Sequence, residues 1–264
     1  MRLSPLVSRT MHASCVVTLL CAGTLSAQIT SGGTILTGDG GTRETLESIF
    51  IPPKLNAPFS LTLETEWIRP LPHGGTYTSQ NRRHIMRDSA GRIHQERWLL
   101  TPKNSSKLQS TMNYIQVSDP AAHTLYNCEV ASKRCYLLTY TGSTAIAYKP
   151  SVGATEALPD GMGFRTHESL GTNTVAGFQT QGYRETVTLN PWAEGNDQPM
   201  VTTWELWYSP HFGISLLSIL DSPRAGKQVF TVTEISAAEP EHSLFTVPEG
   251  YSVVDRRKTE SPSD

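Results

Sequence analysis

The sequence predicts a mainly β protein, built as a curved antiparallel sheet or half-open β-barrel with few short helices. Segments in which apolar and polar residues alternate recur along the chain, and turn-forming residues separate them about every dozen positions. No long amphipathic helix pattern lies between these segments. A parallel α/β fold, in which strands alternate with helices, is therefore not expected.

Residues 1–27 have the layout of a secretory signal peptide. Arg2 and Arg9 precede an apolar run at 15–23, and a small-residue cleavage site ends at Ala27. The run is shorter than the roughly 20 apolar residues of a membrane-spanning helix. We expect an exported, periplasmic or extracellular chain without a transmembrane segment.

A lipid-modified Cys21 is the competing interpretation of this N-terminus. Leu20 stands where a bacterial lipoprotein signal has a small residue, which favours the cleaved, unmodified chain. The full sequence has 22 Lys and Arg, including Arg2 and Arg9 of the signal peptide, against 24 Asp and Glu. The mature chain is therefore acidic, with a net charge of about −4, and nucleic acid is not an expected partner.

The mature chain divides into a leader, one domain and a tail. Residues 28–44 are rich in Gly, Ser and Thr and predict a flexible leader. Residues 45–255 predict a single antiparallel β domain, interrupted by a Pro/Gly-rich excursion at 150–166. A charged tail follows at 256–264, and the stretch 43–50 fits a short helix.

The expected strands follow one another along the domain. Residues 58–67, PFSLTLETEW, alternate apolar with polar side chains, as a half-buried strand does. The same pattern between turn signals predicts further strand segments at 81–87, 92–100, 112–119, 124–130, 135–140, 174–189, 201–208, 213–220 and 227–235.

Cys128 and Cys135 predict a structural disulfide. Signal cleavage leaves only these two cysteines, and exported chains favour disulfides. A hairpin with its turn within 130–133 places them opposite each other, at the about 4.5–5.5 Å Cα separation of paired strands. Closing this loop is worth about 2.5 kcal/mol in the chain-entropy model. A zinc site and a C-x-x-C redox motif do not fit the spacing.

Two C-terminal stretches carry a resemblance to a known family. The run ELWYSP…G and the closing Ser243–Tyr251, SLFTVPEGY, follow the strand at 174–189, which contains Gly177 and Gly182. Together they resemble exported bacterial proteins related to the periplasmic lipoprotein carrier and receptor (LolA/LolB-like) superfamily. The region from 87 to 126 resembles exported proteins of environmental bacteria.

The resemblance implies a curved sheet whose concave face holds an acyl chain or apolar segment. The implied partners are a lipid, a lipoprotein or another envelope component, and no cofactor is expected. Five large side chains are candidates to line such a site: Trp67, Trp98, Trp204, Leu206 and Tyr208. Ordinary core packing is the alternative role for these residues.

The hairpin RRHIMRDSAGRIHQERW contains the best candidate for chemistry. With a three-residue loop ending at Gly91, His84 opposes Glu96 and Met86 opposes His94 on one face. Two imidazoles and a carboxylate are ligands that Zn²⁺ accepts with a position left for water. A solvated face with a His84–Glu96 pair is the alternative.

The same region is basic, and it contains seven Lys and Arg between residues 82 and 107 against Asp88 and Glu96. Such a surface suits anionic headgroups, acidic polysaccharide or an acidic partner, and a mixed-charge solvated face is the alternative. Motifs of the G-x-S-x-G and H-E-x-x-H types are absent from the sequence.

We therefore expect no catalytic residue and a non-enzymatic exported β protein that binds a lipid, lipoprotein or other apolar ligand. A structural or adhesion module of the cell envelope is the first alternative. A metal-dependent hydrolase that uses His84, His94 and Glu96 is the second.

Overall fold

The computed structural model describes residues 34–36, 43–45, 48–105, 107–142 and 153–257. The predicted signal peptide with Cys21, the rest of the leader and the end of the charged tail lie outside these residues. The domain boundaries and the signal peptide remain predictions. No helix in the described part of the chain is long and apolar enough to cross a membrane.

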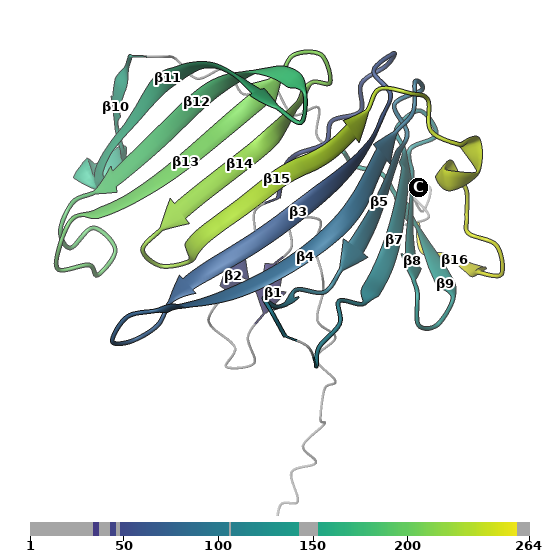
Figure 1. The fold of residues 1–264 in the computed structure, drawn as a ribbon, viewed down its shortest axis with the longest axis horizontal. Coiled ribbons are helices and arrows are strands. Elements are labelled where there is room, and N and C mark those ends of the chain that lie inside the picture. The colour runs from purple at the N-terminus through teal and green to yellow at the C-terminus, as the bar shows by residue number, and fades with distance from the viewer. Residues whose placement is uncertain (1–33, 37–42, 46–47, 106, 143–152, 258–264) are drawn as a thin grey trace, which may run out of the picture.

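One 14-stranded sheet dominates the structure (Figure 1). Its strands are β3 (Phe59–Pro70), β4 (Thr76–Arg87), β5 (Ile93–Trp98), β6 (Thr101–Pro102), β7 (Met112–Asp119), β8 (Thr124–Glu129), β9 (Arg134–Thr139), β10 (Thr155–Ala157), β11 (Gly163–Val175), β12 (Phe178–Leu189), β13 (Met200–Ser209), β14 (Ile214–Ser222), β15 (Gly226–Ser236) and β16 (Ser252–Asp255). A separate two-stranded sheet joins β1 (Thr34–Leu36) to β2 (Arg43–Thr45).

The strands of the large sheet lie in the order β10-β11-β12-β13-β14-β15-β3-β4-β5-β7-β8-β9-β16, and β6 pairs with β4. All neighbours are antiparallel except β16, which runs parallel to β9. The C-terminal strand β15 lies beside the N-terminal strand β3, so the sheet is continuous through its middle. Its end strands, β10 and β16, are not paired with each other, so the sheet does not close into a barrel.

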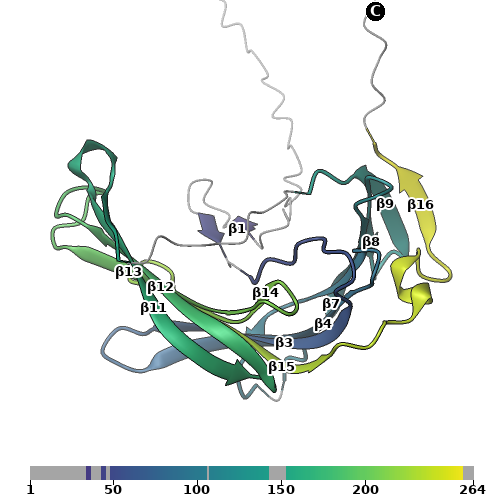
Figure 2. The ribbon, with the colours of Figure 1, turned by 90° about the horizontal axis from the view of Figure 1, so that it is seen from above.

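The sheet is strongly bowed, as Figure 2 shows, and we call the concave side of its backbone the hollow. Register shifts occur in four strand pairs, between Arg97 and Trp98, Ser169 and Gly171, Trp207 and Tyr208, and Val232 and Glu234. Such irregularities bend a strand and increase its twist. We call the inner surface of the sheet the concave face and the outer surface the convex face. The predicted fold class, a curved half-open sheet with few short helices, is confirmed.

The hydrophobic core lies on the floor of the hollow. Phe59, Leu61 and Leu63 alternate with polar residues along β3 and point into the hollow, as their spacing of two requires. Ile49 and Ile51, from the segment before β3, pack over these side chains and are themselves buried. The segment 48–58 therefore covers the middle of the concave face, as the ribbon in Figure 2 shows.

The closing C-terminal motif packs against the convex face. Its 3-10 helix η2 (His242–Phe245) contacts β5 and β7, and Phe245 is buried there. The guanidinium of Arg92 lies 5.1 Å from the centre of the Phe245 ring. The chain then continues into β16, so the motif ends the sheet on the outside of the hollow.

Two local expectations differ from the structure. The helix expected at 43–50 is wrong, because Arg43–Thr45 forms strand β2 in a register fixed by pairing with β1. The Pro/Gly-rich excursion at 150–166 is not wholly irregular, because it contains β10, the 3-10 helix η1 (Pro159–Gly161) and the start of β11. In both places pairing with a neighbouring strand overrides the local preference of the residues.

Candidate functional site

An apolar strip lines one half of the concave face. Side chains alternate between the two faces of a strand, and the pairings place Tyr183, Val187, Trp204, Leu206 and Leu220 on the same face as the core residue Phe230. We call these five residues the apolar strip. Leu206 is buried and the other four are half-buried, so they keep apolar surface toward the hollow.

The five side chains predicted to line a ligand site do not gather in one place. Trp204 and Leu206 belong to the apolar strip, and the Trp204 indole donates to Ser218 Oγ at 3.0 Å. Trp67 shares the concave face but is buried, and its indole donates to the carbonyl of Ala225.

The other two predicted side chains lie apart from the strip. Tyr208, at the end of β13, is half-buried and pairs with Ser215 beyond the register shift that follows Trp207. Trp98 donates from its indole nitrogen to Glu96 at 2.8 Å and so lies on the Glu96 side of β5. Ligand lining stays a prediction for this set of residues.

The other half of the concave face is polar. The pairings of β5, β7 and β8 place Gln95, Arg97, Gln116 and Asn127 on that face. Arg97 Nε donates to Gln116 Oε1 at 2.7 Å, and Gln116 Nε2 donates to Asn127 Oδ1 at 3.1 Å. The concave face therefore carries the apolar strip on β12–β14, where Glu185 opposes Trp204 and forms ion pairs with Arg165 and His167. Polar side chains lie on β4–β8, and the covered core lies between the two regions.

The seven basic residues at 82–107 do not form one continuous surface patch. Arg83, Arg87 and Arg97 point into the concave face, and Arg83 and Arg87 are buried there. Most of the others face carboxylates in ion pairs: Arg82 with Glu64 and Glu234, Arg92 with Asp88, and Lys103 with Glu66. The basic region therefore does not form a single binding surface, because alternation along the strands divides these charges between the two faces of the sheet.

The hairpin register predicted for His84 and Glu96 is confirmed. Met86 pairs with His94, and the His84 Nδ1 lies 3.1 Å from Glu96 Oε2. The same carboxylate oxygen accepts the hydrogen bond from the Trp98 indole. Glu96 is therefore engaged by neighbours on its own hairpin.

His84, His94 and Glu96, the candidate ligands of the alternative zinc site, are not arranged as a metal-binding group in the described residues. His94 Nδ1 lies 2.7 Å from the carbonyl of Leu244 in η2, which gives this ring nitrogen a protein partner. Burial lowers the pKa of His94 from its ordinary value. Over the described ranges, no group of three or more His, Cys, Asp or Glu side chains is arranged to hold a metal ion. The structure thus offers no support for a metal-dependent hydrolase at His84, His94 and Glu96.

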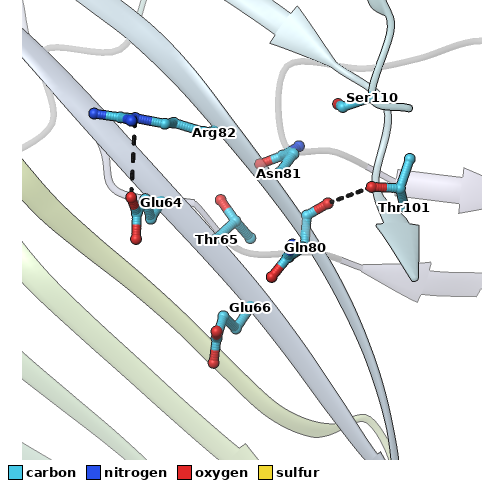
Figure 3. A pocket seen from close by; sticks show the side chains of 8 residues that line it. All are labelled: Glu64, Thr65, Glu66, Gln80, Asn81, Arg82, Thr101 and Ser110. Carbon is cyan, nitrogen blue, oxygen red and sulfur yellow. Dashed lines mark hydrogen bonds and ion pairs between the residues drawn. The ribbon is translucent and has the colours of Figure 1, made fainter. Parts of the chain in front are cut away.

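A depression of about 380 Å³ opens where β6 meets β3 and β4 (Figure 3). Its walls carry polar and charged side chains: Glu64, Thr65, Glu66, Gln80, Asn81, Arg82, Thr101 and Ser110. Arg82 lies 3.9 Å from Glu64, and Lys103 forms an ion pair with Glu66. Because these charges compensate one another and the walls are polar, the depression does not suit an apolar ligand.

The disulfide between Cys128 and Cys135 is present on the side of the sheet opposite the polar half of the hollow. The two residues oppose each other across the β8–β9 hairpin, with the turn at 130–133, as predicted. Their Cα atoms are 3.8 Å apart, closer than the sequence-based expectation. Both side chains are fully buried, which fits a structural bond.

Sequence reasoning missed the inward arginines and Phe212. The sequence did contain a sign of the inward arginines. Arg83 and Arg87 lie two residues before and after the apolar Ile85 on β4, so all three side chains share one face of the strand. Phe212 lies in the turn between β13 and β14, where alternation gives no guide, yet it is fully buried against Phe59 and Phe178.

Comparisons with known proteins concern the fold. No protein-family model matches the sequence, and no curated protein matches it significantly. Solved structures with a similar fold include an uncharacterized conserved protein from Thermus thermophilus, with 11% identity, coverage of 76% of this chain and 92% of that chain, and a TM-score of 0.37.

Two further solved structures also match the chain. In the MucA/MucB complex of Pseudomonas aeruginosa, the match has 14% identity and a TM-score of 0.38, and covers 75% of this chain and 58% of that chain. A LolA superfamily protein from Nitrosomonas europaea matches with 7% identity and a TM-score of 0.29, covering 72% of this chain and 90% of that chain.

Proposed function

We propose that this chain is an exported, non-enzymatic protein that binds a lipid, a lipoprotein or another apolar ligand in the hollow of its curved sheet. The observation that carries the proposal is the apolar strip, whose half-buried apolar side chains lie on the concave face of the sheet. Burial of apolar surface stabilises a complex by about 25 cal/mol per Å². Ligand sites in proteins are concave and mostly apolar, with a few polar groups that orient the ligand.

A matched pair of tryptophans on β13 tests the proposal. Trp204 lies on the concave face. Trp207, three residues further along β13, lies on the convex face and donates its indole hydrogen to Glu205 there. We expect Trp204→Ala to weaken binding of a neutral, apolar fluorescent probe about 10-fold, which corresponds to about 1.4 kcal/mol of lost contact. Titration of the probe into both variants and the unchanged protein measures this.

Trp207→Ala serves as the control, since it removes the same side chain from the same strand on the other face. It is expected to leave probe affinity within about twofold of the unchanged protein. Equal weakening by both substitutions, or no binding by the unchanged protein, would count against the hollow as the site. The second result would favour a structural or adhesion module instead.

A further inference from the structure

Two arginines lie near each other on the polar half of the concave face. Ile85 of β4 and Gln95 of β5 form the last pair of their ladder, and Arg83 and Arg97 lie two residues beyond it, one on each strand, where the charge of Arg97 acts on Arg83. The pairing of Leu63 with Arg83 places this guanidinium on the face that carries the core. Arg97 pairs with Tyr114 and reaches the same face. We call Arg83 and Arg97 the arginine pair.

Neither member of the arginine pair has a carboxylate partner among the described residues. Arg83 is only 6% exposed, donates from Nη2 to Ser48 Oγ, and keeps a buried Nε without an acceptor. Arg97 is partly buried, and Nε donates to the neutral side chain of Gln116.

Other arginines of the chain show how different this arrangement is. Arg82, Arg92 and Arg184 each lie within ion-pair distance of a carboxylate. Arg87 is buried like Arg83, but four hydrogen bonds to backbone carbonyls satisfy its guanidinium. The arginine pair therefore combines burial, proximity of like charges and unused donor capacity.

Physical chemistry makes such a pair costly unless an anion joins it. Like charges close together on neighbouring strands repel each other, and a buried charge without a counter-charge loses hydration. Burial lowers the pKa of Arg83 to about 9, with the charge of Arg97 contributing, and burial lowers the pKa of Arg97 to about 10. Both side chains still carry a positive charge at pH 7, so an anion between them relieves both costs.

We propose that the arginine pair binds an oxyanion, a phosphate or carboxylate group, that forms the polar end of the ligand in the hollow. Guanidinium groups bind such oxygens through forked pairs of hydrogen bonds. Gln95, on the same strand as Arg97, and Gln116 of the neighbouring strand β7 add neutral polar groups on the same face. The inference deepens the proposed function and rests on it, because it makes the ligand an anionic amphiphile.

The distance between the two halves of the hollow suits such a ligand. Four strand spacings separate β13, which carries Trp204, from β4, which carries Arg83. At about 4.8 Å each, these spacings amount to roughly 19 Å across the strands. The pairings place Trp204 level with Trp67 and Arg83 level with Leu63, which adds four residues, or about 13 Å, along the strands. A ligand with its anionic end at the arginine pair can extend its apolar chain toward the apolar strip.

The test compares three probes in competition with the neutral fluorescent probe: decyl phosphate, decanol and inorganic phosphate. In the unchanged protein we expect decyl phosphate to bind at least 10-fold more tightly than decanol. Arg97→Gln is expected to reduce this preference to about twofold or less while decanol affinity stays unchanged. Arg82→Gln is the matched control, because it removes an arginine of β4 that faces the convex side, and it should keep the full preference.

The outcomes separate this inference from the proposed function. Decanol binding without a preference for decyl phosphate, or a preference that Arg97→Gln leaves intact, overturns the inference while the apolar site stands. Binding of inorganic phosphate as tight as that of decyl phosphate, lost in Arg97→Gln, supports the anion site with a free anion as its ligand and contradicts the apolar site. Arg97→Lys provides a second variant. Lysine keeps the positive charge but cannot donate the paired hydrogen bonds of a guanidinium, so its preference for decyl phosphate over decanol should lie between those of the unchanged protein and Arg97→Gln.

Discussion

An Arg87→Leu variant is expected to lose about 4 kcal/mol of the free energy of unfolding. The Arg87 side chain is completely buried and lies 4.7 Å over the ring of Phe59. It donates twice to the carbonyl of Ala57, at 3.0 and 2.8 Å, once to Pro52 at 2.9 Å and once to Phe212 at 2.5 Å. These bonds tie the segment over the concave face and the β13–β14 turn to β4.

The size of the effect follows from what leucine leaves behind. Hydrogen bonds from a charged donor contribute about 1.5–3 kcal/mol, and a buried polar group that loses its partner costs about 1–3 kcal/mol. Leucine restores apolar contact but leaves these carbonyls without a donor. Urea unfolding of the purified variant, compared with the unchanged protein, measures the loss.

Arg82→Leu is the control for this substitution. Arg82 is the same residue type on the same strand, but its side chain is 54% exposed and pairs with Glu234 at 3.1 Å. Surface ion pairs contribute about 0–1 kcal/mol, so this variant should lose no more than that. Similar losses in both variants would show that Arg87 does not connect the covering segment to the sheet.

A Phe212→Ala variant is expected to destabilise the fold by a comparable amount, about 3–5 kcal/mol. Phe212 is fully buried, its ring centre lies 5.9 Å from that of Phe59 and 4.7 Å from that of Phe178, and the contacts are edge-on. Alanine removes both aromatic contacts and leaves a cavity where three elements meet. Thermal and urea unfolding of the variant measure the loss.

Phe164→Ala gives the matched comparison, because Phe164 is 39% exposed on β11. The Phe164→Ala variant should lose less than about 1 kcal/mol of the free energy of unfolding, as is usual for surface substitutions. If Phe212→Ala were as stable as Phe164→Ala, the core would not extend to the β13–β14 turn. Phe212→Ala should also bind the apolar probe less tightly, because the substitution loosens the core packing of the concave face although Trp204 is unchanged.

The sequence was sufficient for features set by local spacing. The alternation of β3 and β13, the DSAG hairpin with Met86 opposite His94, and the Cys128–Cys135 pair depend on residues close in the chain. A spacing of two fixes which side chains share a face, and a short turn fixes the register.

The sequence did not predict features that depend on pairing between strands far apart in the chain. Lys227 pairs with Ile68, so the last long strand completes the sheet beside the first long strand, and no local pattern contains that information. Which face becomes the hollow is decided by the segment 48–58, whose Ile49 and Ile51 cover one side of the sheet. This choice turns Arg83, Arg87 and Arg97 from apparent surface charges into inward groups.

Native mass spectrometry of the protein exported to a bacterial periplasm, without refolding, tests the central claim most directly. The account predicts a lipid-sized adduct that carries an anionic group, on a chain whose mass is two hydrogens below the reduced form because of the Cys128–Cys135 bond. Trp204→Ala and Arg97→Gln should each lower the fraction of protein that carries the adduct. A bare oxidised chain, under conditions that preserve known lipid complexes, would contradict the claim that the hollow binds an amphiphile.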